Sequence, residues 1–241
     1  MVYSSIANDK IKNIKKLNEK KYRDMVGLFL IEGEHVVIEA YKNNCLKTLI
    51  VEENYNFKLD LETMITTTNV LKYISKLDNP PKVMGICYKR DIKELGDKLL
   101  ILDNVQDPGN LGTIIRSAVA FNIDTMILGS DCVDLYNPKV LRATQGLIFG
   151  INIKVENIPD IIPSLKQKGY KLLVTNLNGG NDIKTIEKNN KFAIIVGNEG
   201  QGVKKEIIDL SDESIYIKMN SKCESLNVGV ATGIILYELD K

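Results

Sequence analysis

The stretch Asp-Pro-Gly-Asn-Leu-Gly-Thr-Ile-Ile-Arg, residues 107–116, decides the fold class of this chain of 241 residues. It follows the apolar run Leu-Leu-Ile-Leu at residues 99–102, which is typical of a strand buried on both faces of a parallel sheet. The Pro-Gly pair predicts a turn, and Asn110 is a candidate cap for a helix over residues 111–121. A buried strand, a polar turn and a helix in this order predict an α/β fold whose functional groups lie at the strand ends.

The same order of elements continues to the C-terminus. A helix start is expected at Asn137-Pro138, because asparagine is a good cap and proline suits the first turn. Regular alternation of strand and helix predicts a mostly parallel sheet with helices on both faces. The expected strands are residues 125–128, 150–155, 171–175, 192–196 and 215–217, and the expected helices are residues 161–168, 204–210 and 226–239.

The first 90 residues predict a smaller α/β domain. Apolar residues recur at helical spacing in the lysine-rich stretch 8–22, so a helix is expected there. Further helices are expected at residues 36–41 and 69–77. Short apolar runs predict strands at residues 29–31, 48–51, 64–67 and 83–88. We therefore divide the chain into an N-terminal domain, a linker and a C-terminal domain, at residues 1–90, 91–97 and 98–241.

Bulk composition excludes several classes of protein. No apolar run approaches 18 residues, so no membrane span or membrane partner is expected, and residues 1–8 lack a signal-peptide core. The four cysteines form no CxxC pair, which favours reduced thiols in a cytoplasmic protein. His35 is the only histidine, so a histidine triad or a multi-histidine metal site is excluded, and we expect no metal.

The charge is unevenly distributed although the net charge is only +1. Residues 1–24 carry seven basic and three acidic side chains, a local charge of +4. Such a segment can bind phosphates, and the alternative is a solvated helix face. The candidate RNA contacts in this segment are Lys12, Lys15, Lys16, Lys20 and Arg23.

Two further polar motifs follow predicted strands. Residues 196–202 read Val-Gly-Asn-Glu-Gly-Gln-Gly, and three glycines in six residues allow a ligand to approach the backbone closely. Lys205 stands where the dinucleotide fingerprint GxGxxG needs its last glycine, and no P-loop motif is present. Residues 224–231 read Glu-Ser-Leu-Asn-Val-Gly-Val-Ala, where Ser225 is a candidate helix cap. The GxxxG spacing of Gly229 and Gly233 predicts close helix packing.

Taken in order, these motifs closely resemble the three signature motifs of the SpoU (TrmH-like) RNA ribose methyltransferases. The resemblance covers residues 98–241 and includes Ile217-x-Met219 with Ser-Leu-Asn-Val at residues 225–228. The family usually has proline where this chain has Lys218. The N-terminal part resembles the L30e/L7Ae-like substrate-binding extensions of the same family, on the basis of residues 10–23 and 29–35.

The resemblance implies a specific chemistry. Such enzymes transfer a methyl group from S-adenosylmethionine to a ribose 2′-hydroxyl, bind this cofactor in a deep trefoil knot of the C-terminal domain, and act as homodimers. Position by position, the resemblance assigns the cofactor contacts to Gly197, Ile217, Met219, Leu226 and Asn227. It assigns the catalytic set to Asn110, Arg116, Glu199, Ser225 and Asn227.

A 2′-hydroxyl acceptor demands RNA and excludes DNA. We expect a 23S-type ribosomal RNA substrate, because the N-terminal extension favours a large structured RNA. A tRNA 2′-O-methyltransferase and a non-catalytic RNA-binding or assembly protein with a degenerate knot stay open as alternatives, whereas the missing GxGxxG motif argues against a nicotinamide-dependent oxidoreductase. Arg116 either activates the hydroxyl as a base or stabilises the developing alkoxide as a cation.

Overall fold

The structure is a computed structural model that describes residues 2–92, 94–176, 179–187 and 189–240. These residues form two compact units. Unit 1 contains residues 1–90 and 134–149, and unit 2 contains residues 91–133 and 150–241. Within the described part of the chain, every helix is too short or too polar to cross a membrane.

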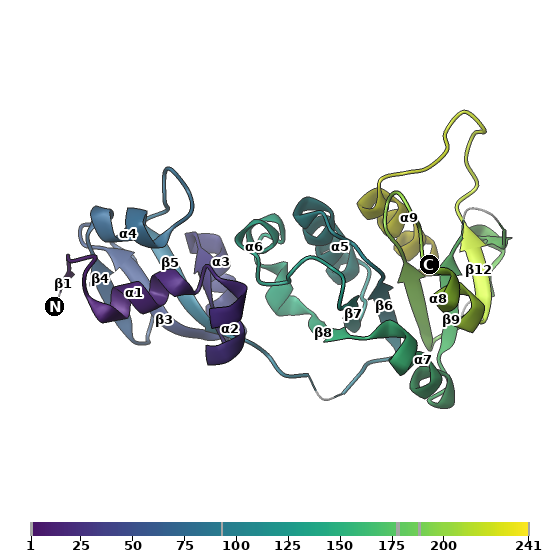
Figure 1. Ribbon diagram of the computed structural model, residues 1–241, viewed down its shortest axis with the longest axis horizontal. Helices are drawn as coiled ribbons and strands as arrows, with labels where there is room; N and C mark the ends of the chain where they lie inside the picture. Colours follow the sequence, from purple (N-terminus) through teal and green to yellow (C-terminus); the bar gives the residue numbers. More distant parts are fainter. Residues whose placement is uncertain (1, 93, 177–178, 188, 241) are drawn as a thin grey trace. The chain divides into compact units, whose positions relative to one another are not determined.

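Unit 1 is built on a mixed five-stranded sheet in the order β1-β4-β3-β5-β2 (Figure 1). The neighbours β1, β4 and β3 are parallel, while β5 is antiparallel to both β3 and β2. The sequence prediction of a small N-terminal α/β fold is therefore confirmed. The strands are β1 (Val2–Tyr3), β2 (Leu28–Glu32), β3 (Leu46–Glu52), β4 (Thr63–Thr66) and β5 (Val83–Tyr88).

The lysine-rich N-terminal stretch forms two helices instead of one continuous helix. The helix α1 (Asp9–Lys16) begins after Asn8, whose side chain accepts a hydrogen bond from the Lys10 N–H at 2.9 Å. A break follows, where the Asn18 side-chain amide donates to the carbonyl oxygen of Ile74 at 2.8 Å. The chain then resumes as α2 (Lys20–Val26) and ends at Gly27 with a φ of 67°.

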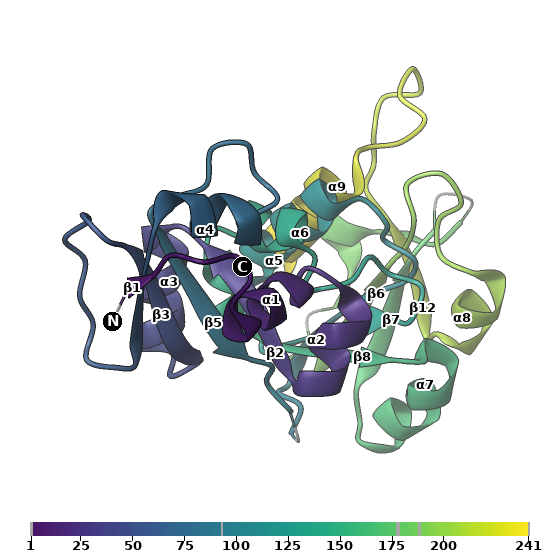
Figure 2. The ribbon, with the colours of Figure 1, turned by 60° about the vertical axis from the view of Figure 1, so that its left-hand side comes forward.

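The core of unit 1 lies between this N-terminal stretch and the sheet. Buried residues of α1 and α4 (Thr68–Ile74) share one apolar cluster with residues of β2, β3, β4 and β5. The two helices lie side by side (Figures 1 and 2). The helix α3 (Glu34–Lys42) packs against β2, β3 and β5.

Residues 134–149 belong to unit 1 although they follow the first strands of unit 2 in the sequence. They contain α6 (Pro138–Ala143) and the start of the 3₁₀ helix η1 (Leu147–Gly150). Asn137 caps α6 by accepting from the Lys139 N–H at 2.9 Å, which confirms the predicted helix start. The segment packs on β2, where the Phe29 ring centroid lies 4.5 Å from that of Tyr136 and 6.3 Å from that of Phe149.

Unit 2 contains a seven-stranded sheet in the order β10-β12-β9-β11-β6-β7-β8. Each pair of neighbours is parallel, which confirms the predicted parallel α/β sheet. The threading of the chain in a trefoil knot stays a prediction. The strands are β6 (Lys98–Leu102), β7 (Thr125–Gly129), β8 (Asn152–Glu156), β9 (Lys171–Thr175), β10 (Asn181–Asp182), β11 (Phe192–Val196) and β12 (Glu213–Tyr216).

Helices cover both faces of this sheet (Figure 1). The helices α7 (Ile158–Gln167) and α8 (Lys205–Leu210) share an apolar cluster with odd-numbered residues of β6 and β11 and with β9. The helix α5 (Pro108–Ala120) packs against α9 (Val228–Asp240). A Cβ atom added at Gly229 would lie 3.1 Å from Thr113 Cγ2, so the GxxxG spacing does serve close helix packing. The 3₁₀ helix η2 (Ile183–Thr185) follows β10.

Candidate active site

Two of the three polar motifs line one cavity of unit 2, and the first motif is hydrogen-bonded to them beside it. They follow β6, β11 and β12, and the carboxyl ends of parallel strands lie at the same edge of a sheet. The cavity has a volume of about 350 Å³ and is formed by the second and third motifs with residues of β9 and α9. Its lining includes six of the predicted site residues, namely Gly197, Glu199, Ile217, Met219, Ser225 and Leu226.

The loop after β11 folds back on itself at Gly197. The Asn198 N–H donates to the Gly202 carbonyl oxygen at 3.1 Å, and the Gly202 N–H donates to the Asn198 carbonyl oxygen at 2.9 Å. A Cβ atom at Gly197 would lie 2.3 Å from the Gly202 carbonyl carbon and from the Val203 nitrogen. Gly202 adopts a φ of 70°, in the region that favours glycine. Glycine is therefore required here by the fold of the loop itself.

Two contacts fasten this loop to the loop after β6. The Asp103 side chain is 2% exposed, and its carboxylate accepts a hydrogen bond from the Lys204 N–H at 2.8 Å. The Asn198 side-chain amide donates to the Asn104 carbonyl oxygen at 3.0 Å, and Asn104 has a φ of 58°. The sequence interpretation missed Asp103, Asn104 and Asn198, although the polar Asp-Asn pair directly after a buried strand is a detectable signal.

One chain of hydrogen bonds connects all three motifs. The Asn110 side-chain amide donates to Glu199 Oε1, and the Asn227 amide donates to Asn110 Oδ1 at 2.9 Å. Glu199 and Ser225 line the cavity, while Asn110 and Asn227 extend the network beside it. Four of the five predicted catalytic residues are thus brought together.

The helix caps differ from two sequence predictions. Asn110 is not the cap of α5, because the helix begins at Pro108 and the Asp107 carboxylate accepts from the Asn110 N–H at 2.8 Å. Ser225 is not the cap of α9, because this helix begins at Val228 and Asn227 Oδ1 accepts from the Gly229 N–H at 3.0 Å. As a consequence, the Asn110 side chain is available for Glu199.

Arg116 lies outside the cavity of its own chain. It is exposed on α5, and among the described residues no side chain or carbonyl group binds its guanidinium. The structure therefore does not bring Arg116 to the other four predicted catalytic residues within one chain. Its guanidinium can contact a ligand or another molecule without first breaking an ion pair.

The predicted RNA contacts of the N-terminal segment separate into two groups. Lys12, Lys16 and Lys20 are exposed, and the Lys15 Nζ lies 5.3 Å from the centroid of the Tyr73 ring. Arg23, in contrast, is 3% exposed. The buried position of Arg23 disfavours a direct contact with RNA.

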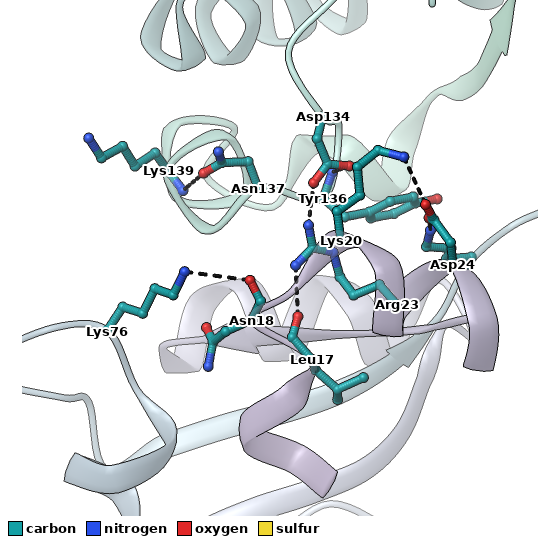
Figure 3. Close-up of polar contacts among 11 residues, drawn as sticks. Leu17, Asn18, Lys20, Arg23, Asp24, Lys76, Asp134, Tyr136, Asn137 and Lys139 are labelled. Atoms are coloured by element: carbon teal, nitrogen blue, oxygen red, sulfur yellow. Dashed lines mark hydrogen bonds and ion pairs between the residues drawn. The ribbon is translucent and has the colours of Figure 1, made fainter.

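Arg23 instead connects two parts of unit 1 (Figure 3). It donates to the Leu17 carbonyl oxygen at 2.8 Å and forms an ion pair with Asp134. Nearby, hydrogen bonds lower the pKa of Asp24 to about 2, and the bond from Lys20 has a larger effect than the bond from Lys89. These contacts give part of the basic segment a structural role.

Comparisons with known proteins match both parts of the chain. A model described as the SpoU rRNA Methylase family matches residues 97–237, and a model described as the MRM3-like substrate binding domain matches residues 8–85. Among curated relatives, 23S rRNA (guanosine(2553)-2′-O)-methyltransferase RlmP of Bacillus subtilis (strain 168) is 38% identical, with 98% of this chain and 97% of the relative covered.

Solved structures give the same result. An AdoMet-bound rRNA methyltransferase from Sinorhizobium meliloti matches with a TM-score of 0.88 and 30% identity, covering 99% of this chain and 97% of that protein. An RNA 2′-O ribose methyltransferase matches with a TM-score of 0.83 and 28% identity, covering 99% and 98% respectively. The similarity therefore extends over both units.

Proposed function

The chain belongs to the SpoU rRNA methylase family, and on this premise we propose that it methylates a ribose 2′-hydroxyl of 23S ribosomal RNA. Family membership confirms the predicted RNA methyltransferase activity and the predicted cofactor, S-adenosylmethionine. The observation that carries the proposal is the hydrogen-bonded chain of Asn227, Asn110 and Glu199, which connects all three motifs beside the cavity that Glu199 lines.

The cavity fits S-adenosylmethionine in size and charge. Its volume of about 350 Å³ lies within the range of small-molecule sites. Among the described residues of its lining Glu199 is the single charged one, so none of them would repel a sulfonium group. Gly197, Ile217, Met219 and Leu226 would hold this cofactor, which supplies a methyl group already activated on sulfur. Asn227, the other predicted cofactor contact, extends the network beside the cavity.

The substitution of the family's usual proline by Lys218 leaves the cavity lining intact. Ile217 and Met219 both line the cavity, whereas Lys218 is exposed and is absent from the lining. Both neighbours of Lys218 therefore line the cavity in which we propose that the cofactor binds. The departure from the family pattern is compatible with cofactor binding.

The catalytic polar groups are arranged to orient the acceptor ribose. Glu199 and Ser225 line the cavity, and Asn110 fixes the Glu199 carboxylate through a hydrogen bond. Positioning of this kind lowers the barrier because the hydroxyl oxygen must approach the methyl carbon in line, at roughly 3–3.5 Å. We assign Asn110 and Asn227 to holding this arrangement.

Arg116 completes the site in a homodimer. It is exposed and outside the cavity of its own chain, so in a homodimer it would reach the cavity of the second copy. Val230 of α9 is 51% exposed, which provides an apolar surface for the contact between copies. As a cation with five N–H donors, Arg116 would orient the substrate phosphate and stabilise the developing alkoxide.

Unit 1 would bind the RNA. Its match to a substrate binding domain and the exposed lysines of α1 and α2 support this role. Because the chain's net charge is only +1, affinity for RNA would come from a local surface and fall with salt. The proposed place of action is the cytoplasm.

The assignment of Arg116 can be tested by separating binding from transfer. We expect Arg116→Ala to lower methyl transfer by about a thousandfold, as for loss of a group that stabilises transition-state charge, with S-adenosylmethionine affinity unchanged. Calorimetry measures the affinity, and transfer of a labelled methyl group to RNA measures the activity. Equal losses in both quantities would contradict a catalytic role. Arg116→Lys is the control, because it retains the charge but lacks the forked geometry.

A further inference from the structure

A groove crosses one face of the sheet in unit 1, beside α1 and α2. Its volume is about 260 Å³, and Leu28, Met64 and Ile86 of three strands form an apolar floor. Its rim is polar and consists of Lys10, Asn13, Tyr22, Lys47, Thr48 and Glu62. A nucleobase has flat apolar faces and a polar edge, so this combination of floor and rim matches its chemistry.

The apolar surface continues beyond the groove. Tyr88 is 50% exposed and lies two residues after Ile86 on β5, so both side chains are on the same face of the sheet. Tyr88 is also paired with Leu28 across the sheet. Val26, which lines the groove, is 37% exposed. An exposed aromatic ring beside an apolar groove is a surface on which a base can stack.

Two lysines flank the groove, and no described acidic residue pairs with either of them. In the described part of the chain, neither Lys10 nor Lys47 forms a salt bridge. The Lys10 Nζ lies 5.9 Å from the Tyr3 ring centroid, and the Lys47 Nζ lies 5.4 Å from that of Tyr88. Both cations can therefore contact phosphates without the loss of an ion pair.

Among the described residues, Glu62 is the one acidic residue that lines the groove. Its carboxylate accepts a hydrogen bond from the Thr48 hydroxyl at 3.2 Å, which fixes its position. A carboxylate repels phosphate but accepts hydrogen bonds from exocyclic amino groups of bases. The charge pattern thus favours a base inside the groove and phosphates at Lys10 and Lys47.

From these observations we infer that the groove binds one unpaired base of the RNA substrate, with the neighbouring phosphates on Lys10 and Lys47. The inference rests on the proposed function, and it names the place on unit 1 where RNA is recognised. None of the RNA contacts predicted from the sequence lines this groove. The site is built from residues of two helices, four strands and the segment before β4, which only the fold brings together.

The test compares two double variants of the full chain. Lys10→Ala with Lys47→Ala removes the flanking cations, and Lys58→Ala with Lys72→Ala removes two other exposed lysines of unit 1 that form no salt bridge among the described residues. The probe is a fluorescently labelled single-stranded RNA decanucleotide, and anisotropy measures its affinity over a range of salt. We expect about a tenfold loss for the groove variant, with its salt slope reduced by about 1.4, since each single-strand phosphate contact contributes about 0.7.

A second variant tests base recognition. We expect Glu62→Gln to reduce a preference of the wild-type protein for cytosine over uracil, because only the cytosine edge offers an amino group to the carboxylate. An oligonucleotide that contains 4-thiouridine should form a cross-link with Tyr22 or Tyr88. A cross-link confined to other elements would contradict the inference.

The outcomes separate the inference from the proposed function. If wild-type protein binds RNA and the two double variants lose affinity equally, or not at all, the groove is not the site. If the protein bound duplex RNA as tightly as single-stranded RNA, the recognition of an unpaired base would be contradicted. If wild-type protein neither binds RNA nor transfers a methyl group, the proposed function itself fails. Calorimetry with S-adenosylmethionine confirms that each variant keeps its cofactor site intact.

Discussion

The cavity of unit 2 and the groove of unit 1 differ in charge, in the way that their proposed ligands require. The cavity is lined by backbone groups and uncharged side chains, with Glu199 as its single charge. The groove has two lysines on its rim that are free of salt bridges among the described residues. A site for a cationic small molecule needs a matching shape and a lining without positive charges, whereas a site for phosphates needs exposed lysines.

The two regions also differ in what keeps them in shape. Backbone hydrogen bonds and a glycine that no other residue can replace fold the loop around the cavity. Side chains that lie mostly on regular helices and strands form the groove, and long-range polar contacts hold unit 1 together. A single substitution in the loop should therefore cause a large loss of affinity for the proposed cofactor. A single substitution in the groove should cause only a small loss of affinity for RNA.

The largest effect should follow from breaking the buried ion pair of unit 1. Asp134→Ala leaves the Arg23 guanidinium buried without its partner, which we expect to lower the free energy of unfolding by about 3 kcal/mol. Urea denaturation followed by circular dichroism measures the loss. The control is Asp9→Ala, which removes an acid whose side chain is 93% exposed. A similar small change in both variants would show that the pair does not stabilise unit 1.

The next effect should appear in the cavity of unit 2. Gly197→Ala places a Cβ atom 2.3 Å from the Gly202 and Val203 backbone, so the loop must open. We expect S-adenosylmethionine affinity to fall by at least about a hundredfold, or about 2.8 kcal/mol. Gly200→Ala is the matched control, because its added Cβ atom would meet nothing closer than 3.6 Å. Unchanged cofactor affinity in Gly197→Ala would show that the cofactor does not need the folded loop.

A smaller effect should come from the contact between the two loops. Asp103→Ala leaves the Lys204 N–H without its acceptor, and an unpaired polar group costs about 1–3 kcal/mol. We expect cofactor affinity to fall about tenfold while RNA affinity stays unchanged, as calorimetry and anisotropy would show. Asp131→Ala removes the exposed partner of the Lys204 ammonium and should leave cofactor affinity unchanged. Loss of RNA affinity in Asp103→Ala would contradict the separation of the two regions.

The smallest effect concerns the exposed charges of unit 1. Hydrogen bonds from Lys20 and Lys89 lower the pKa of Asp24 to about 2, below its unfolded value of about 3.9. The carboxylate therefore contributes stability above pH 4, and the contribution is lost as the pH falls from 4 to 2. Because Asp24 is exposed, we expect Asp24→Asn to cost less than about 0.5 kcal/mol at pH 7. A difference in unfolding free energy that grew below pH 4 would contradict this assignment.

The sequence predicts the longer strands better than the irregular segments and the shortest strands. The bounds of β9 and β11 agree with the predicted strands because continuous apolar runs between polar segments mark a buried parallel strand. The α1–α2 break was missed, since Asn18 reaches an acceptor on Ile74, 56 residues later. The two-residue strands β1 and β10 were also missed, because two residues carry no periodic pattern.

Long-range packing explains why the sequence did not show the place of residues 134–149 or the burial of Arg23, one of the predicted RNA contacts. Residues 134–149 join unit 1 through Arg23 and Phe29, and Asp134 lies 111 residues from its partner Arg23. Arg23 looked like a surface cation for the same reason, because no local pattern marks its burial. The capping error at Asn110 arose locally, since Asp107 and Asn110 are both good caps and only the position of Pro108 decides between them.

The most direct test of the central claim is to map the methyl group that this protein transfers. Purified protein is incubated with labelled S-adenosylmethionine and total RNA from a strain that lacks the gene, and 2′-O-methyl sites are located by resistance of the RNA backbone to alkaline cleavage. We predict one new site, in 23S ribosomal RNA. A single site in tRNA would retain the chemistry and contradict the substrate. Absence of transfer, together with absence of cofactor binding by calorimetry, would contradict the account as a whole.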